Sequence, residues 1–314
     1  DVLGSRGLGD VYKRQVVKHG TTNFLATTLT SSKKTLKEVL EKIGELQDKD
    51  LGGATIFGAH MEGPYFDAKF KGAQNDKYIK PAGIDEIKEF IDIKPGLIKL
   101  FSMAANGEHD EDVIKFLKSN NIVVSVGHSG ASFEQVQNAV KAGLSHATHT
   151  YNGMRGFNHR DPGVVGAVLV NDNINAEIIF DKIHVHPEAV RLLFKAKGVD
   201  KVMCITDAMC ATGLKDGKYK LGELDVYVKD RQARLVSNDS LAGSVLTLDR
   251  AFKNILELGY SIFDAVKMTS TNAAREFGLD CGEIQEGKIA DLVVLDENYN
   301  VEMTIVKGEI KYRI

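Results

Sequence analysis

The stretch IVVSVGHSGASFEQVQNAVKAGLSHATHT, residues 122–150, contains the two patterns that decide the fold. It begins with a β-branched run that ends at His128 and continues with apolar residues at helical spacing. It closes with a second β-branched run that ends near His149. A strand, a helix and a second strand in this order are typical of a βαβ unit, whose two strands are parallel.

The same alternation extends along most of the chain. Short apolar runs predict strands at 23–29, 54–60, 96–104, 122–128, 144–150, 176–181 and 201–208. Apolar residues at helical spacing predict helices at 33–47, 110–120, 132–143 and 187–198. We therefore expect an α/β fold, and in particular a TIM-like (β/α)8 barrel. Such a barrel needs about eight strands, so its first strand is expected to be missing or overwritten.

Residues 1–15, DVLGSRGLGDVYKRQ, do not continue this pattern. They lack an amphipathic period and the apolar core of a secretory signal, and they run without a linker into globular sequence. We interpret them as a non-native junction segment in place of the first strand. The barrel is then expected over 16–282, with a β-hairpin insertion, one strand pair around a polar turn, near 216–237. The tail 283–314 is expected to be part of a small β domain.

Composition restricts the classes of partner. The chain has 314 residues and is 43% hydrophobic, which allows a large core. Its 40 basic and 43 acidic residues are mixed, which argues against nucleic acid as the main partner but allows a local phosphate pocket. No run approaches about 18 apolar residues, so no membrane span is predicted. Cys204, Cys210 and Cys281 show no C-x-x-C spacing, which favours reduced thiols and a cytoplasmic protein.

Metal-ligating residue types stand at the ends of three predicted strands. GAHMEGPYF places Glu62 just before Gly63-Pro64, VVSVGHSG places His128 at a strand end, and THTYNGM does the same for His149. Taken alone, Glu62 is explained equally well by a structural salt bridge. In a barrel, however, the carboxyl ends of the strands meet on the face that carries active sites. One Glu and two His would leave an open position on a tetrahedral Zn²⁺ for a catalytic water.

His146 and His149 lie close together in LSHATHTYNGM. They could be a metal pair, one ligand with a bystander, or two ordinary polar residues. On a strand, an odd separation points two side chains to opposite faces, so we do not expect them to share one ion. His146 is then expected to pack behind the barrel.

Further polar residues suit an anionic substrate and proton transfer. Asp207 in CITDAM could move a proton between water and a leaving nitrogen, although an Asp that caps a helix explains it about as well. YNGMRGFNHRDPG offers Asn152, the amide of Gly153, and Arg160, whose planar guanidinium suits phosphate. FDKIHVHP offers His184 near another strand end.

Together, eight motifs resemble the N-acetylglucosamine-6-phosphate deacetylases of the amidohydrolase superfamily over roughly residues 16–314. The motifs are HMEGPYF, KGAQN, VGHSGAS, THTYNGM, HRDPGVVGAVL, ITDAM, LAGSVLTLDRA and TSTNAAREFGL with GEIQEGKIADLVVLD. The resemblance implies a metal-dependent hydrolase barrel joined to a small β-sandwich domain. It also implies hydrolysis of the N-acetyl group of N-acetylglucosamine 6-phosphate to glucosamine 6-phosphate and acetate.

The resemblance also implies roles for individual residues. The metal ligands fall on Glu62, His128 and His149, and the catalytic Asp falls on Asp207. Substrate contacts fall on Ala73, Gln74, Asn152, Gly153, Arg160 and His184. One divalent metal is expected, with Zn²⁺ favoured and Fe²⁺, Co²⁺ or Mn²⁺ as alternatives. The expected partners are a phosphorylated N-acetyl amino sugar and a second copy of the chain in a homodimer.

Two departures from the family pattern leave alternatives open. The first-strand H-x-H that binds a second metal in many relatives is absent, because residues 1–15 contain no histidine. Lys182 stands where relatives usually have Gly, which affects the expected turn around His184. The alternatives are a deacetylase for another N-acylated amino sugar, a cyclic-amide hydrolase, or an inactive metal-binding remnant.

Overall fold

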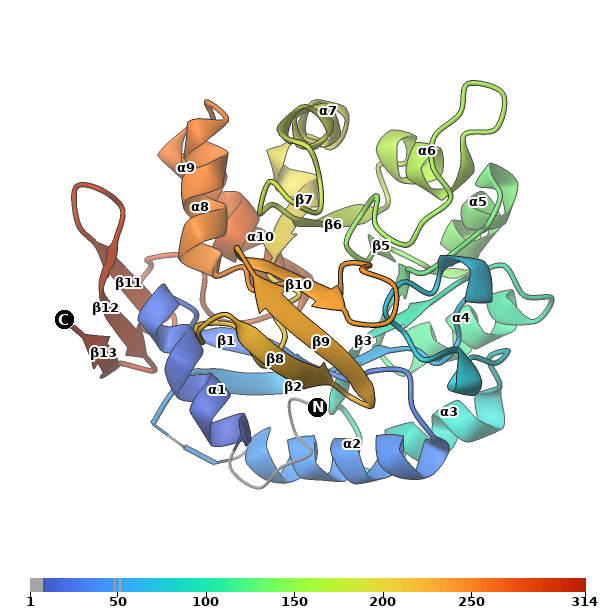
Figure 1. The fold of residues 1–314 in the computed structure, drawn as a ribbon, viewed down its shortest axis with the longest axis horizontal. Coiled ribbons are helices and arrows are strands. Elements are labelled where there is room, and N and C mark those ends of the chain that lie inside the picture. Colours follow the sequence, from blue (N-terminus) through green and yellow to red (C-terminus); the bar gives the residue numbers. More distant parts are fainter. Residues whose placement is uncertain (1–7, 48, 51) are drawn as a thin grey trace. The chain divides into compact units, whose positions relative to one another are not determined.

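The computed structural model describes residues 8–47, 49–50 and 52–314 (Figure 1). The chain divides into two compact units. Unit 1 contains residues up to Phe24 together with 46–57 and 178–314, and unit 2 contains residues 25–45 and 58–177. Residues 1–7 of the predicted junction segment lie outside the described residues. The remainder of that segment belongs to helix α1 (Leu8–Val16), which is amphipathic, so the expectation that the segment lacks an amphipathic period is wrong for these residues.

One sheet contains seven strands in the order of the chain, from β1 to β7. Each corresponds to a predicted strand: β1 (Asn23–Thr27), β2 (Thr55–Glu62), β3 (Ile98–Met103), β4 (Val123–Val126), β5 (His146–Ala147), β6 (Asn175–Ile179) and β7 (Val202–Ile205). The pairs β2–β3, β3–β4, β4–β5 and β5–β6 are parallel. This sequential order is that of a (β/α) barrel, since a doubly wound sheet reverses its order at a switch point. The described residues contribute no eighth strand to this sheet.

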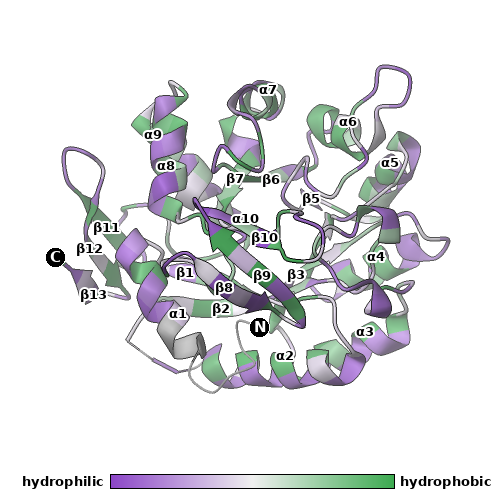
Figure 2. Cartoon of the chain, in the orientation of Figure 1, coloured by the Kyte–Doolittle hydropathy of each residue, from purple (hydrophilic) through white to green (hydrophobic). Residues whose placement is uncertain are grey.

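A helix lies in each connection of this sheet. The six are α2 (Lys33–Gln47), α3 (Ile84–Ile91), α4 (Asp110–Ser119), α5 (Phe133–Ala142), α6 (Gly163–Val170) and α7 (Pro187–Lys197). The predicted helices α2, α4, α5 and α7 are confirmed. Hydrophilic and hydrophobic residues are interspersed along α2 (Figure 2), and the apolar residues Leu36, Leu40 and Ile43 are buried. Helix α6 escapes a search for periodicity because apolar residues cover it on all sides.

Three of the strands end before the predicted site residues that follow them, His128, His149 and Asp207. Strand β5 contains only His146–Ala147, so the prediction of a strand over 144–150 is too long, and His149 lies in the turn that follows. His128 and Asp207 also lie just beyond their strands. Strand alternation therefore cannot relate His146 to His149. His146 is fully buried, and its Nε2 lies 3.6 Å from Glu177 Oε1.

Hydrogen bonds between buried side chains join the strands of unit 2. His60 Nε2 lies 2.7 Å from Ser102 Oγ, and Ser102 Oγ lies 2.6 Å from Thr148 Oγ1. Thr148 Oγ1 also lies 2.6 Å from Ser125 Oγ. Burial lowers the pKa of His60 to about 4, so its ring is neutral at pH 7. These polar groups thus satisfy one another inside the sheet that carries the candidate site.

Unit 1 contains two small antiparallel sheets. The first consists of β8 (Gly217–Leu221), β9 (Leu224–Lys229) and β10 (Gln232–Leu235), in the order β10-β9-β8. The prediction of one strand pair near 216–237 is therefore wrong, because Gly222, at φ 58°, closes an additional turn. The second consists of β11 (Leu292–Leu295), β12 (Val301–Val306) and β13 (Glu309–Arg313). Its place in the tail agrees with the predicted small β domain.

Unit 1 is completed by three helices and a core cluster. The helices are α8 (Leu248–Glu257), α9 (Ile262–Val266) and α10 (Asn272–Glu276), with a π-helical turn over Lys267–Thr271. The cluster consists of Val16, Val17, Ala54 and Val306, with Tyr12, Phe24 and Tyr312 packed against it. None of the helices among the described residues is long and apolar enough to cross a bilayer.

Candidate metal centre and active-site residues

Glu62, His128 and His149 lie together in unit 2. Glu62 Oε1 lies 3.0 Å from His128 Nε2 and 3.3 Å from His149 Nε2. The two Nε2 atoms lie 3.2 Å from one another, and all three residues are buried. The sequence separations are long, so only the parallel sheet brings these three residues to one point. Within the described residues they form a group with the donor atoms of a divalent cation site.

The backbone fixes which nitrogen each histidine presents. His128 Nδ1 lies 2.9 Å from the carbonyl oxygen of Phe70, and His149 Nδ1 lies 3.1 Å from that of Asn152. A carbonyl oxygen only accepts, so each Nδ1 donates a hydrogen and a neutral ring presents the lone pair of Nε2 toward Glu62. Metal-ligating histidines typically have this arrangement. Three converging acceptor atoms repel one another unless a cation or proton lies between them, so the donor set fits a metal ion.

The charge state of Glu62 suits the same site. Burial acts to raise the pKa of Glu62, but when no metal ion is bound and the His128 and His149 rings carry a proton on Nε2, their hydrogen bonds and charges outweigh burial and hold this pKa well below its usual value. Glu62 is therefore a carboxylate at neutral pH. A buried carboxylate without compensation would be costly.

Gln74 also holds Glu62. Its Nε2 donates to Glu62 Oε1 at 3.3 Å, and its Oε1 accepts from the amide of Thr30 at 2.9 Å. The prediction that Gln74 and the neighbouring Ala73 contact the sugar stays a prediction. The side chain of Gln74 is buried and already has a structural role beside Glu62.

Three of the predicted site residues other than Gly have a left-handed backbone. The φ angles are 48° at His128, 32° at His149 and 48° at Asp207. Such values are uncommon for residues other than Gly, and they cluster at functional sites where the surroundings hold them. No sequence pattern predicts this feature, because none of these positions is a Gly.

The turn after His149 contains the predicted phosphate contacts Asn152 and Gly153. Asn152 Nδ2 is buried and has no hydrogen-bond partner among the described residues, which is unusual for a buried donor. Gly153 has φ 59°, and a Cβ there would lie 2.8 Å from His128 Nδ1. The turn thus combines an unsatisfied donor with a position where only Gly fits closely against a candidate ligand.

Arg160 does not join this group. It lies exposed in the loop after the turn, and its backbone amide donates to Asn158 Oδ1 at 3.0 Å. Arg155, which was not predicted, is the arginine of this loop whose guanidinium pairs with Asp161. A contact between Arg160 and phosphate remains a prediction.

Asp207 lies in unit 1, directly after β7. Its carbonyl oxygen accepts from the amide of Ser244 at 2.7 Å, and the amide of Met209 donates to the carbonyl of Ser244 at 2.9 Å. Ser244 Oγ also bonds to the carbonyl of Thr206. The loop around Ser244 therefore fixes the backbone on both sides of Asp207, a role that no local sequence pattern predicts.

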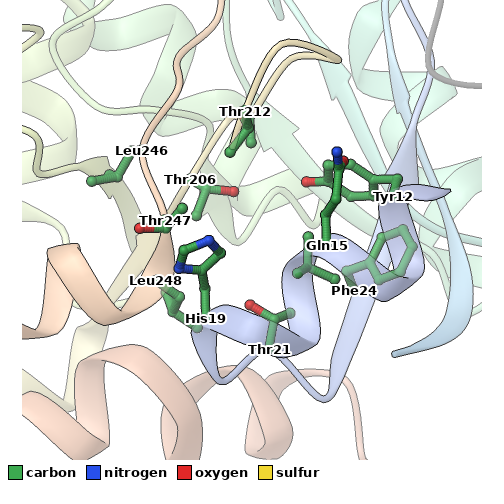
Figure 3. A pocket seen from close by; sticks show the side chains of 12 residues that line it. Tyr12, Gln15, His19, Thr21, Phe24, Thr206, Thr212, Leu246, Thr247 and Leu248 are labelled. Atoms are coloured by element: carbon green, nitrogen blue, oxygen red, sulfur yellow. The ribbon is translucent and has the colours of Figure 1, made fainter. Parts of the chain in front are cut away.

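Tyr12 of helix α1 lies close to Asp207. Burial and the negative charge of Asp207 raise the pKa of Tyr12 to about 12, and the Tyr12 hydroxyl forms a hydrogen bond with Thr206. Figure 3 shows the Tyr12 hydroxyl directed toward Thr206 across a pocket of about 50 Å³ that lies within unit 1. The predicted junction segment thus supplies a side chain beside the predicted catalytic residue, which sequence reasoning missed.

His184 forms a compact turn with Asp181 in unit 1. Asp181 Oδ2 lies 2.7 Å from His184 Nδ1, and Asp181 Oδ1 accepts from the amides of Ile183 and His184, both at 2.8 Å. Lys182 within this turn has φ 66° and forms an ion pair with Glu257. A lysine thus adopts the left-handed conformation that a Gly would adopt without steric cost.

A β/α-barrel sheet with a buried Glu-His-His cluster at or just past its strand ends defines a class, that of the metal-dependent hydrolases built on this barrel. The model of the amidohydrolase family matches residues 13–311, and this chain belongs to that family.

Individual relatives agree with this assignment. The N-acetylglucosamine-6-phosphate deacetylase of Lysinibacillus sphaericus is 41% identical over 94% of this chain and 76% of its own length. The crystal structure of the enzyme of that name from Thermotoga maritima has a TM-score of 0.90 at 38% identity, over 96% of this chain and 82% of the other. A variant of the Mycobacterium smegmatis enzyme, solved in complex with N-acetyl-D-glucosamine-6-phosphate, has a TM-score of 0.93 at 29% identity, over 98% and 81%.

Proposed function

We propose that this chain hydrolyses the N-acetyl group of N-acetylglucosamine 6-phosphate and releases glucosamine 6-phosphate and acetate. The observation that carries the proposal is the convergence of Glu62, His128 and His149 with their Nδ1 atoms turned to backbone carbonyls. The relatives that match most of the chain carry the name of this activity, and one was solved with this phosphosugar.

The residues divide into three roles in this proposal. Glu62, His128 and His149 would hold one divalent metal ion, which when bound would lower the pKa of a water and polarise the acetyl carbonyl. Asp207 accepts a proton from the attacking water and returns it to the leaving nitrogen of the amide. The bond between the acetyl carbon and nitrogen breaks, and the products are a free amine and acetate.

Phosphate recognition is assigned to the turn after His149. Asn152 Nδ2 is a buried donor that lacks a partner among the residues described, and a phosphosugar oxygen would satisfy it. The amide of Gly153, Arg160 and His184 are proposed as further contacts, with Ala73 and Gln74 near the sugar. Binding energy far from the amide then positions the acetyl group.

The nature of the ion and the assembly are parts of the same proposal. Zn²⁺ is favoured for one Glu and two His, with Fe²⁺, Co²⁺ and Mn²⁺ as alternatives. A single ion is proposed, because among the described residues Glu62, His128 and His149 are the one group of three metal-ligating side chains that lie together. We also propose a homodimer in the cytoplasm, where the three free cysteines would remain reduced.

The test is metal analysis beside turnover. We expect about one metal ion per chain and release of acetate from N-acetylglucosamine 6-phosphate, with a much lower kcat/KM for N-acetylglucosamine without phosphate. A higher kcat/KM for N-acetylgalactosamine 6-phosphate, the C4 epimer, would mean that the substrate is this other amino sugar. Bound metal without any turnover would contradict the proposal and favour an inactive metal-binding remnant.

A further inference from the structure

The Asp181–His184 turn has the geometry of an orienting carboxylate. Both side chains are almost completely buried, with 2% of Asp181 and 7% of His184 exposed. Each oxygen of Asp181 has a separate task, because Oδ1 accepts two backbone amides and Oδ2 contacts the imidazole. The carboxylate is therefore fixed by the backbone before it contacts the ring.

Asp181 is an ionised carboxylate at neutral pH in this position. Burial acts to raise the pKa of Asp181, but the hydrogen bond and charge of His184, together with the two backbone amides, outweigh burial and lower this pKa. A carboxylate only accepts hydrogen bonds, so His184 Nδ1 carries a hydrogen and donates it to Asp181 Oδ2. Nε2 is then the ring atom through which His184 can contact a ligand.

We propose that Asp181 is a positioning residue that fixes the orientation and the tautomer of His184, so that Nε2 meets an oxygen of the substrate. The inference deepens the proposed function and rests on it, since it takes His184 as a contact of the phosphosugar. Asp181 itself does not touch substrate. Serine hydrolases use the same chemistry, in which a buried Asp holds the Nδ1–H form of a histidine and replacement by Asn inverts the tautomer.

The turn around Asp181 is held independently of the sheet register. Phe180, the preceding residue, has a carbonyl that accepts from the buried Asn254 Nδ2 at 2.7 Å. Lys182 reaches Glu257 on helix α8, the helix that also carries Asn254. Helix α8 thus holds the turn on both sides of Asp181, and a ring fixed in such a turn loses little orientational freedom on binding.

The test is Asp181→Asn, which keeps the shape and retains an acceptor oxygen for the two backbone amides. The amide nitrogen would then face Nδ1 as a donor, and the ring would be driven to the Nε2–H form. Nitrogen-15 NMR of the histidine rings in the full chain reads the tautomer directly, and the His184 signal is identified by its absence in His184→Gln. We expect the Nδ1–H form in the wild type and the Nε2–H form in Asp181→Asn.

Turnover of N-acetylglucosamine 6-phosphate provides the second readout. We expect Asp181→Asn to lower kcat/KM by about 10–100-fold, the usual effect of losing the partner of a functional histidine. In a His184→Gln background the same change should alter kcat/KM by less than about twofold, because Asp181 acts through His184. A full effect in that background, or an unchanged tautomer, would overturn the inference.

A matched control is Asp249→Asn. Asp249 is another carboxylate of unit 1 that contacts a histidine, His19 Nδ1, at 3.2 Å. The Asp249→Asn substitution should leave the His184 tautomer unchanged, and a changed His184 tautomer in this variant would also contradict the proposal. The tautomer is measured without substrate. Absence of turnover in the wild type would therefore refute the proposed function while the NMR result still decides the role of Asp181.

Discussion

Unit 2 and unit 1 each bury histidine rings beside a carboxylate, but they use opposite nitrogen atoms. In the Glu62–His128–His149 cluster, Nδ1 donates to a backbone carbonyl and Nε2 faces the carboxylate. In the Asp181–His184 turn, Nδ1 faces the carboxylate. A carboxylate at Nε2 beside a second Nε2 forms a ligand set, whereas a carboxylate at Nδ1 orients the ring and leaves Nε2 for another group.

The comparison predicts its largest effect at Glu62. Glu62→Gln removes the negative charge between two Nε2 atoms, so the chain should lose its metal. Turnover should fall by more than the roughly 10–100-fold that is expected when only a hydrogen-bond partner is lost. Metal content after dialysis checks this. Glu86→Gln is the control, because Glu86 is a carboxylate of unit 2 held by Tyr65 and Lys80. Equal metal loss in both variants would break the comparison.

Asp207→Asn should separate chemistry from metal binding. If Asp207 transfers the proton, turnover should fall by about 10²–10⁴-fold. Metal content should remain unchanged, since Asp207 is not a member of the Glu-His-His group. Asp200→Asn, which removes an exposed carboxylate paired with Lys267, should have almost no effect on either quantity. Retained turnover in Asp207→Asn would show that another base serves the reaction.

Gly153→Ala should disturb the metal cluster through sterics alone. Its backbone has φ 59°, and the new Cβ would lie 2.8 Å from His128 Nδ1. We expect a loss of stability of about 1–3 kcal/mol, together with weaker metal affinity. Gly96→Ala is the matched control, because Gly96 also has a positive φ, 79°, but open space around its Cβ. Both variants should unfold at lower denaturant, and only Gly153→Ala should bind metal less tightly.

Asp181→Asn should also give a stability difference that depends on pH. The lowered pKa of Asp181 means that its carboxylate stabilises the fold above the ordinary value of 3.8, and that this stabilisation is lost as pH falls through the lowered pKa. The free energy of unfolding of the wild type should therefore exceed that of the variant most at neutral pH, and this difference should shrink below pH 3.8. Denaturation curves over this pH range measure it. A gap that grew on acidification would have the wrong sign.

The smallest expected effect is that of Lys182→Gly. A Gly relieves the strain at φ 66° but adds freedom to the unfolded chain and removes the exposed ion pair with Glu257. These contributions oppose one another, so we expect a change within about 1 kcal/mol and an unchanged His184 tautomer. A large loss of stability would mean that the Lys182–Glu257 pair, and not Asp181, holds the turn.

Much of the sheet could be predicted from the sequence, because buried parallel strands are short apolar runs with a recognisable spacing. All seven predicted strands exist, and the three predicted metal ligands lie together. The strand over 144–150 was predicted too long, since β-branched residues such as Thr148 and Thr150 continue past the point where pairing stops at Ala147. Local composition does not report where a partner strand ends.

Other features had no local signal at all. The third strand of the 216–237 insertion depends on the turn at Gly222, and the polar residues around Gly222 do not distinguish this turn from the rest of the segment. The position of Tyr12 beside Asp207 joins residues almost two hundred apart, and only the fold brings them together. Which nitrogen each histidine presents depends on backbone carbonyls such as those of Phe70 and Asn152, and only the fold places these.

The left-handed backbone at His128, His149 and Asp207 determines how a substitution library at this site must be read. Each replacement has two separate effects, one from its side-chain chemistry and one from the steric cost of a positive φ. Asn, Asp and Gly adopt a positive φ at low cost, whereas for Val, Ile and Thr the cost is high whatever their side chains could do. In a comprehensive mutational scan, the loss measured for Asp207→Asn therefore reports the missing charge, while the loss for Asp207→Val reports mainly the backbone.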